Sequence, residues 1–213
     1  MKFLTLSALL LLLFSSCSRS EPRINHGFME LVYYASRDGI EERFSFFILA
    51  EDDDGIENLS ELYLFHDREG LRWQINADDW VSHVENGNTW IGSRSIAMTA
   101  NAVLPRGLYR AVLVNKGGER TERNFTFDSP VRSPYPFPSL SISDNIYRIE
   151  SQYPLNYFVI YDQQGRAIDT IPLQSNEGRI QDLRLSGNAR NLSLWSSDPN
   201  YLISAFTDAV SIR

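Results

Sequence analysis

Acidic residues form one dense cluster in this chain, directly after an apolar stretch. Asp52, Asp53 and Asp54 are followed by Gly55, and carboxylates around a glycine turn are the ligands that calcium loops use. Such a loop also needs an oxygen ligand at position 50, where this chain has Ala50. We therefore favour a solvated loop between two strands. A weak calcium site built from the three aspartates is the alternative, and no other cofactor is predicted.

Residues for catalysis do not fall into a recognisable pattern. The spacing of the three histidines, His26, His66 and His83, does not fit a zinc site, so no metal site is predicted from them. No nucleophile elbow, zinc-protease helix or glycine-rich phosphate loop occurs in the sequence. Two of the 27 acidic residues could in principle cleave a glycoside, yet no pair stands out. We predict no catalytic residue and no enzyme activity.

Four tryptophans raise a different kind of binding chemistry, because exposed aromatic rings on β-sandwiches can stack on sugars. Trp73 lies on the apolar face of an alternating run and is interpreted as a core residue. Trp80 and Trp90 flank one loop, and they are the candidates for glycan stacking. We favour the simpler interpretation that both cover an edge of the fold.

The only cysteine, Cys17, follows a basic residue and a short apolar run. Lys2 precedes the predominantly apolar residues 3–14, and small residues lead to Cys17, which is typical of an export signal. The run is too short to span a bilayer, which needs about 20 residues. This segment resembles a bacterial lipoprotein signal, although the usual leucine three residues before the cysteine is Phe14 here. The resemblance implies that residues 1–16 are removed and that Cys17 is diacylated and becomes the new N-terminus.

Lipid attachment at Cys17 would place the protein in the bacterial cell envelope, at the inner or the outer membrane. Two or more acyl chains hold a protein stably to a membrane, whereas one holds it only marginally. Removing Lys2 leaves 19 basic against 27 acidic residues, a formal charge of −8. A nucleic-acid partner is therefore excluded, because phosphate binding needs a basic surface. With a single cysteine no disulfide forms within the chain, and the fold must rest on its core.

Strand-like runs separated by turn signals fill residues 27–128. Residues 71–75 alternate strictly between apolar and polar, as expected of a half-buried antiparallel strand. Asp78 is interpreted as the cap of one helical turn that carries Trp80 and ends at Gly87. The other strands are expected at residues 28–35, 43–50, 62–66, 90–98, 110–115 and 120–127.

About seven strands in 100 residues is the number expected of an immunoglobulin-like β-sandwich. Residues 48–56 running into 62–64 resemble the strand, acidic loop and strand of bacterial Ig-like and fibronectin type III-like modules. The motif Pro105-x-Gly107-x-Tyr109 is similar to their penultimate strand. The resemblance implies an all-β fold in which Tyr109 occupies the tyrosine corner, with its hydroxyl bonded to backbone upstream.

The segments around this sandwich differ in composition. Polar residues 17–26 are expected to form a tether. Four prolines in residues 129–139 favour an extended, semi-rigid linker, because proline lacks the donor that a central strand needs. Residues 140–213 are predicted to form a smaller β-rich domain. The alternative is that their strands pack onto the first sandwich as one extended unit.

These observations predict a non-catalytic, lipid-anchored envelope lipoprotein that acts as a protein-interaction or structural module. A carbohydrate-binding module that uses Trp80 and Trp90 is the alternative. The identity of the partner does not follow from the sequence.

Overall fold

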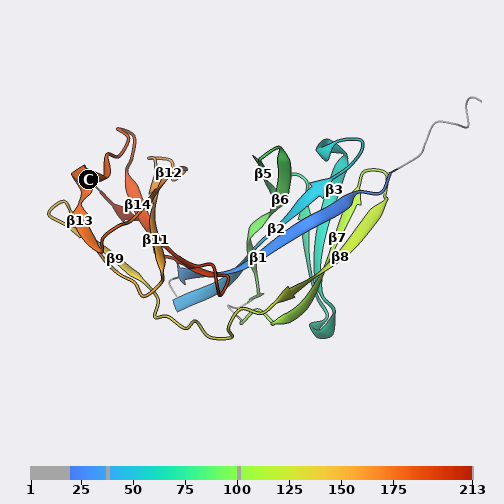
Figure 1. Cartoon of the computed structure of the whole chain (residues 1–213), viewed down its shortest axis with the longest axis horizontal. Coiled ribbons are helices and arrows are strands. Elements are labelled where there is room, and N and C mark those ends of the chain that lie inside the picture. The colour runs from blue at the N-terminus through green and yellow to red at the C-terminus, as the bar shows by residue number, and fades with distance from the viewer. Residues whose placement is uncertain (1–19, 37–38, 100–101, 213) are drawn as a thin grey trace, which may run out of the picture. The chain divides into compact units, whose positions relative to one another are not determined.

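The regular secondary structure of the described residues is almost entirely β-strand, as the sequence predicts (Figure 1). The computed structural model describes residues 20–36, 39–99 and 102–212. The 3₁₀ helices are η1 (Ile56–Asn58), η2 (Asp67–Glu69) and η4 (Ile180–Leu183). The strands are β1 (Arg23–Ser36), β2 (Gly39–Glu51), β3 (Leu59–His66), β4 (Leu71–Asn76), β5 (Val81–Glu85), β6 (Asn88–Ala97), β7 (Gly107–Asn115), β8 (Arg120–Phe127), β9 (Ser139–Ser143), β10 (Ile146–Glu150), β11 (Leu155–Tyr161), β12 (Ala167–Pro172), β13 (Glu177–Arg179), β14 (Asn191–Asp198), β15 (Ile203–Phe206) and β16 (Val210–Ser211).

The first eight strands have the order of an Ig-like sandwich. One sheet contains the order β1-β2-β6-β5, and the other is β4-β3-β7-β8. Lettered along the chain, these are the A-B-E-D and C′-C-F-G sheets of the immunoglobulin fold. The predicted all-β, Ig-like class is therefore correct, and the topology itself defines it.

The C-terminal strands continue the first sheet. β15 pairs in parallel with β1, with Leu31 opposite Ile203 and Tyr34 opposite Phe206. The complete order is β12-β11-β14-β15-β1-β2-β6-β5, and β16 also pairs with β14. A third sheet, β13-β10-β9, contains the remaining strands.

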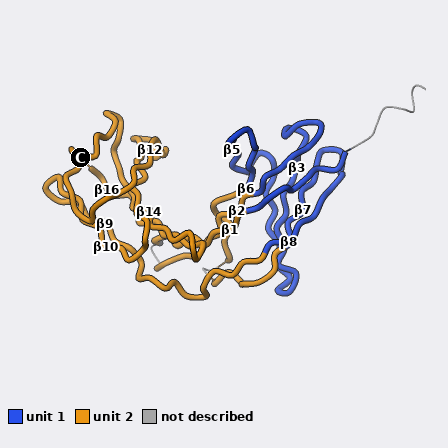
Figure 2. Tube along the Cα trace, in the orientation of Figure 1, with its two compact units in different colours: residues 1–27, 48–92, 110–125 blue, residues 28–47, 93–109, 126–213 orange. Residues whose placement is uncertain are grey.

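Two compact units result, and Figure 2 colours them separately. Unit 1 comprises the described residues within 1–27, 48–92 and 110–125, and unit 2 those within 28–47, 93–109 and 126–213. Strands β1, β2, β6, β7 and β8 contribute residues to both units. None of the boundaries between the units falls within the proline-rich segment 129–139.

Each unit has its own buried apolar side chains. In unit 1, Ile48, Leu62, Leu64 and Leu113 are fully buried, and they come from alternate positions of β2, β3 and β7. In unit 2, a second cluster lies around Phe158 of β11 and includes Tyr147, Ile160, Leu192 and Leu194. Full burial of each such side chain stabilises the fold by about 1.5–3 kcal/mol. The C-terminal strands thus supply a substantial core to unit 2.

The predicted tyrosine corner is present in unit 2. The hydroxyl of Tyr109 donates to the carbonyl oxygen of Pro105 at 2.7 Å, and the side chain is fully buried. Its ring meets that of Phe44 edge-on at 5.2 Å, and Phe44 meets Phe127 at 4.4 Å. This contact fixes the start of β7 against β2 and β8.

The helical turn predicted after Asp78 is wrong, because residues 81–85 form strand β5. β5 pairs with β6 in antiparallel register, with Glu85 opposite Asn88. The two residues between them, Asn86 and Gly87, have φ angles of 51° and 79°. Two left-handed residues of this type make the tight hairpin turn that Asn-Gly favours. The Asn-Gly signal therefore outweighs the helical spacing of the apolar residues.

Candidate functional site

The acidic loop of unit 1 uses Asp52 to hold its own backbone in place. Oδ1 of Asp52 accepts hydrogen bonds from the Asp54 amide at 2.9 Å and from Nδ2 of Asn58 at 3.0 Å. Oδ2 accepts from Nδ2 of Asn115 at 3.2 Å. Burial alone would raise the pKa of Asp52, but these hydrogen bonds outweigh it and lower the pKa. Asp52 therefore joins the loop to the end of β7.

Asp53 is engaged by a cation from β1. Nη2 of Arg23 lies 2.7 Å from Oδ1 of Asp53, and Nε of Arg23 lies 3.5 Å from Oε2 of Glu51. The hydrogen bond and the charge of Arg23 lower the pKa of Asp53. Within the described residues, no group of three or more His, Cys, Asp or Glu side chains is arranged to hold a metal ion. Calcium binding by Asp52, Asp53 and Asp54 stays a prediction.

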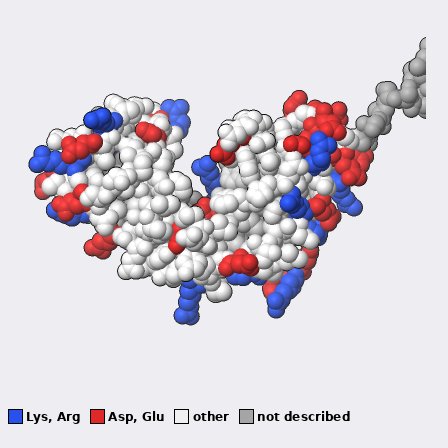
Figure 3. All heavy atoms as spheres, viewed as in Figure 1, with Lys and Arg blue, Asp and Glu red and all other residues white. Residues whose placement is uncertain are grey.

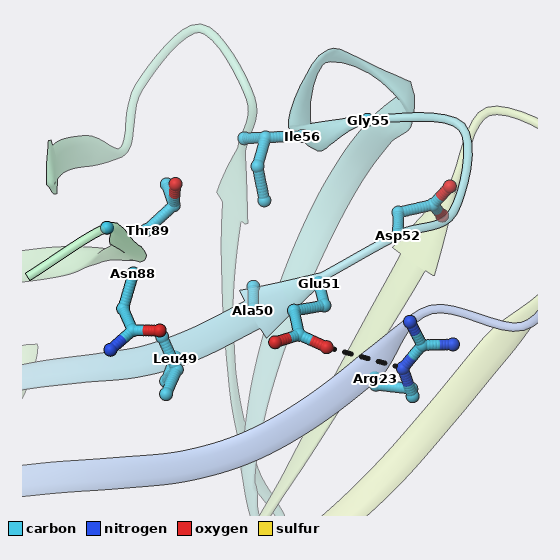
Figure 4. A pocket seen from close by; sticks show the side chains of 10 residues that line it. Arg23, Leu49, Ala50, Glu51, Asp52, Gly55, Ile56, Asn88 and Thr89 are labelled. Carbon is cyan, nitrogen blue, oxygen red and sulfur yellow. Dashed lines mark ion pairs between the residues drawn. The ribbon is translucent and has the colours of Figure 1, made fainter.

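A shallow depression of about 260 Å³ lies beside this loop (Figure 4). Figure 4 shows the paired Arg23 and Glu51 on one side and Asn88 and Thr89 on the other. Because Glu51 and Asp53 both neutralise Arg23, the depression has no free cation for an anionic ligand. The residues that line it are Arg23, Leu49, Ala50, Glu51, Asp52, Gly55, Ile56, Gly87, Asn88 and Thr89.

The two tryptophans proposed for glycan stacking lie in different local settings of unit 1. Trp80 is in the turn before β5, where its amide donates to the carbonyl oxygen of Asn76 at 3.1 Å. Trp90 lies on β6 and packs with two histidines. The ring of His83 is nearly parallel to that of Trp90, with 6.4 Å between the ring centroids and 8° between the planes, and the ring of His26 meets it edge-on at 6.0 Å. The third histidine, His66, ends β3 and is buried.

Strand β5 is the most exposed strand of unit 1. All five of its residues are exposed, and Val84 has 70% of its surface accessible. It is the last strand of its sheet, so only one of its two backbone edges is paired. An exposed strand edge is a template for a strand from another chain. Sequence reasoning missed this feature because it placed a helical turn here.

An aromatic row crosses four strands of unit 2, and no local pattern in the sequence predicts it. Tyr157 stacks on Trp195 at 4.8 Å, Trp195 on Phe206 at 5.8 Å, and Phe206 on Tyr34 at 5.5 Å. Arg43 on β2 lies 4.8 Å above the ring of Tyr34 and ends the row. Each ring covers the face of its neighbour, which leaves few ring faces for a sugar. The row instead stabilises the register of β11, β14, β15 and β1.

The proline-rich segment is attached to unit 2 at both ends. Arg106 donates to the carbonyl oxygens of Ser129 at 2.9 Å and Pro130 at 2.7 Å, and it pairs with the half-buried Glu42 at 3.3 Å. At the other end, the hydroxyl of Tyr135 donates to Asp198 at 2.6 Å. This hydrogen bond raises the pKa of Tyr135 to about 12 and lowers that of Asp198.

Cys17, the predicted site of lipid attachment, lies outside the described residues. No helix within residues 20–36, 39–99 and 102–212 has the length and apolar character to cross a membrane.

No protein-family model matches the chain, and no curated protein sequence matches it significantly. Among solved structures, it is similar to dimeric latent PorU from Porphyromonas gingivalis, with 15% identity, a TM-score of 0.35, and coverage of 91% of this chain but 20% of PorU. It is also similar to the N-terminal Ig1-2 module of the Drosophila receptor protein tyrosine phosphatase DLAR, with 12% identity, a TM-score of 0.42, and coverage of 90% and 97%. Murine CEACAM1b has 10% identity, a TM-score of 0.27, and coverage of 88% and 99%. The fold assignment rests on the strand order described above.

Proposed function

We propose that this chain is a non-catalytic envelope lipoprotein that binds a protein partner while acyl groups on Cys17 hold it to a membrane. The anchor is motivated by the sequence, in which a lone cysteine follows a short apolar run. The binding role is motivated by the all-β, Ig-like fold, which presents rigid strands and short loops.

One observation carries the binding role: several large apolar side chains are exposed to solvent, although the fold already has a buried apolar core. Ile40, Val103 and Val131 of unit 2 are each more than half exposed, as is Val84 of unit 1. Ile40 lies two residues before Glu42, which pairs with Arg106. Val103 precedes Leu104 and Val131 follows Pro130, and the carbonyl oxygens of Leu104 and Pro130 both accept from Arg106. Exposed apolar residues near one network of hydrogen bonds support a protein-interaction surface here.

The anchor is tested by metabolic labelling with palmitate in the host bacterium. We expect label in the wild-type chain and none in Cys17→Ser, together with a shift of the variant from the membrane to the soluble fraction. Equal labelling and equal fractionation of the two chains would refute the anchor.

The binding role is tested separately, by cross-linking intact cells with formaldehyde, a membrane-permeable reagent that bridges nucleophilic side chains, and purifying the chain. We expect a defined protein to be recovered with the wild-type chain and to be lost when Ile40, Val103 or Val131 is changed to aspartate in a chain that still folds. Recovery of the same protein with every variant would assign binding to another surface, and recovery of no protein would refute the role.

A further inference from the structure

The edge strands of this protein differ in how well they are protected against pairing with another chain. Natural sheets block their edges with proline and with charged side chains. β12 ends in Pro172 and carries Asp169, and β8 carries Arg120, Glu122 and Arg123. β5, with the sequence Val-Ser-His-Val-Glu, has no proline and only a terminal acidic residue. Its outer edge is therefore open to a further strand.

The hairpin register shows which backbone groups of β5 face outward. In a two-residue hairpin, the residues that flank the turn form a hydrogen-bonded pair, and such pairs alternate along the ladder. Glu85 and Asn88 flank the turn, so Glu85, His83 and Val81 direct their amide and carbonyl groups toward β6. Ser82 and Val84 direct theirs away from β6. Both residues are exposed, so a partner strand can reach these groups.

The charge of unit 1 indicates what kind of strand would add there. Its described residues include seven basic and fourteen acidic side chains, a formal charge of −7. Asp and Glu side chains gather over the part of unit 1 that carries the acidic loop (Figure 3). Asp78 and Asp79 precede β5 and Glu85 ends it, and all three are exposed. A segment with lysine or arginine is attracted to this edge, and an acidic one is repelled.

We propose that the outer edge of β5 is a strand-addition site, at which Ser82 and Val84 pair with an extended, basic segment of a partner protein. The five residues of β5 span about 17 Å, so the segment that pairs contains about five residues. Backbone hydrogen bonds supply the affinity, and alternate side chains of the segment supply the selectivity. This inference goes beyond the proposed function, because it adds a second protein-binding surface, on unit 1, to the one around Ile40, Val103 and Val131. It rests on the proposed function in one respect, that the partner is a protein.

The test selects binders to the full chain from a phage-displayed library of random nine-residue peptides. We expect the enriched peptides to alternate β-branched and basic residues. Their synthetic forms should bind at least tenfold more weakly to Val84→Pro, which lacks the outward amide, and within twofold of wild type to Val84→Thr, which keeps it. Proline is tolerated at an edge position whose amide faces solvent, so the β5–β6 ladder should survive. Circular dichroism of each variant verifies the fold.

A measurement on the unsubstituted chain keeps the inference testable if Val84→Pro does not fold. Bound peptide should slow hydrogen exchange at the amides of Ser82 and Val84, while that of His83, already directed toward β6, changes little. Protection elsewhere, unchanged affinity for Val84→Pro, or the absence of enriched peptides would overturn the site. A dimer that forms through β5, seen by sedimentation and lost in Val84→Pro, would overturn the choice of occupant. If cross-linking recovers a partner while β5 binds no peptide, this inference fails and the proposed function stands.

Discussion

Removing one hydroxyl, by Tyr109→Phe, tests the tyrosine corner with little change in packing. The substitution keeps the ring contacts with Phe44 and Phe127 but deletes the 2.7 Å hydrogen bond to the carbonyl oxygen of Pro105. Because Tyr109 is fully buried, the carbonyl is left without that donor, and we expect a loss of about 1–3 kcal/mol in the free energy of unfolding. For a urea dependence of about 2 kcal/mol per molar, the unfolding midpoint should fall by about 0.5–1.5 M.

Urea unfolding followed by tryptophan fluorescence measures this shift. Tyr157→Phe is the matched control, because Tyr157 is half-buried in the aromatic row and keeps its ring contact with Trp195 after the change. We expect the control to stay within about 0.5 kcal/mol of wild type. Equal midpoints for Tyr109→Phe and Tyr157→Phe would refute the structural role assigned to the Tyr109 hydroxyl.

Three further predictions concern the loop, the pH dependence and the tryptophans. Asp52→Ala should lower the urea midpoint, because Asn58 and Asn115 lose their acceptor. If the loop also binds calcium, adding calcium should raise the urea midpoint of the wild-type chain. Folding lowers the pKa values of Asp52 and Asp198, so their contribution to stability is present above about pH 4 and is lost as the pH falls further. In Asp198→Asn the melting temperature should therefore fall less steeply than that of wild type as the pH is lowered below about 4. If the chain binds a glycan, Trp90→Ala should abolish the signal on a glycan array, whereas binding that persists in both Trp90→Ala and Trp80→Ala would remove the carbohydrate-binding alternative.

Local patterns in the sequence predict the parts of the fold that depend on neighbouring residues. The alternation in residues 71–75 gives β4, and the motif around Tyr109 gives the tyrosine corner. The parallel pairing of β1 with β15 is different, because it joins residues 31–34 to residues 203–206. No local pattern encodes a pairing over that separation, so the sequence does not predict it.

The candidate surfaces likewise include features that depend on residues distant in the sequence, which local patterns do not predict. The aromatic row depends on Tyr34, Tyr157, Trp195 and Phe206 being in register across strands that are distant in the sequence. The edge of β5 was missed for another reason, since Val81 and Val84 fit a helical spacing while Asn86 and Gly87 fit a hairpin. The hairpin forms because a left-handed pair of residues costs little at Asn-Gly and continues directly into β6.

Site-specific photo-cross-linking in intact cells tests most directly the claim that this protein binds a partner through β5. A photoreactive amino acid is placed at position 82 on β5 or, as the control, at position 170 on β12, the strand at the opposite end of the same sheet. The account predicts a covalent adduct with another protein from position 82 and none from position 170. Equal adducts from both positions, or adducts only from position 170, would contradict it.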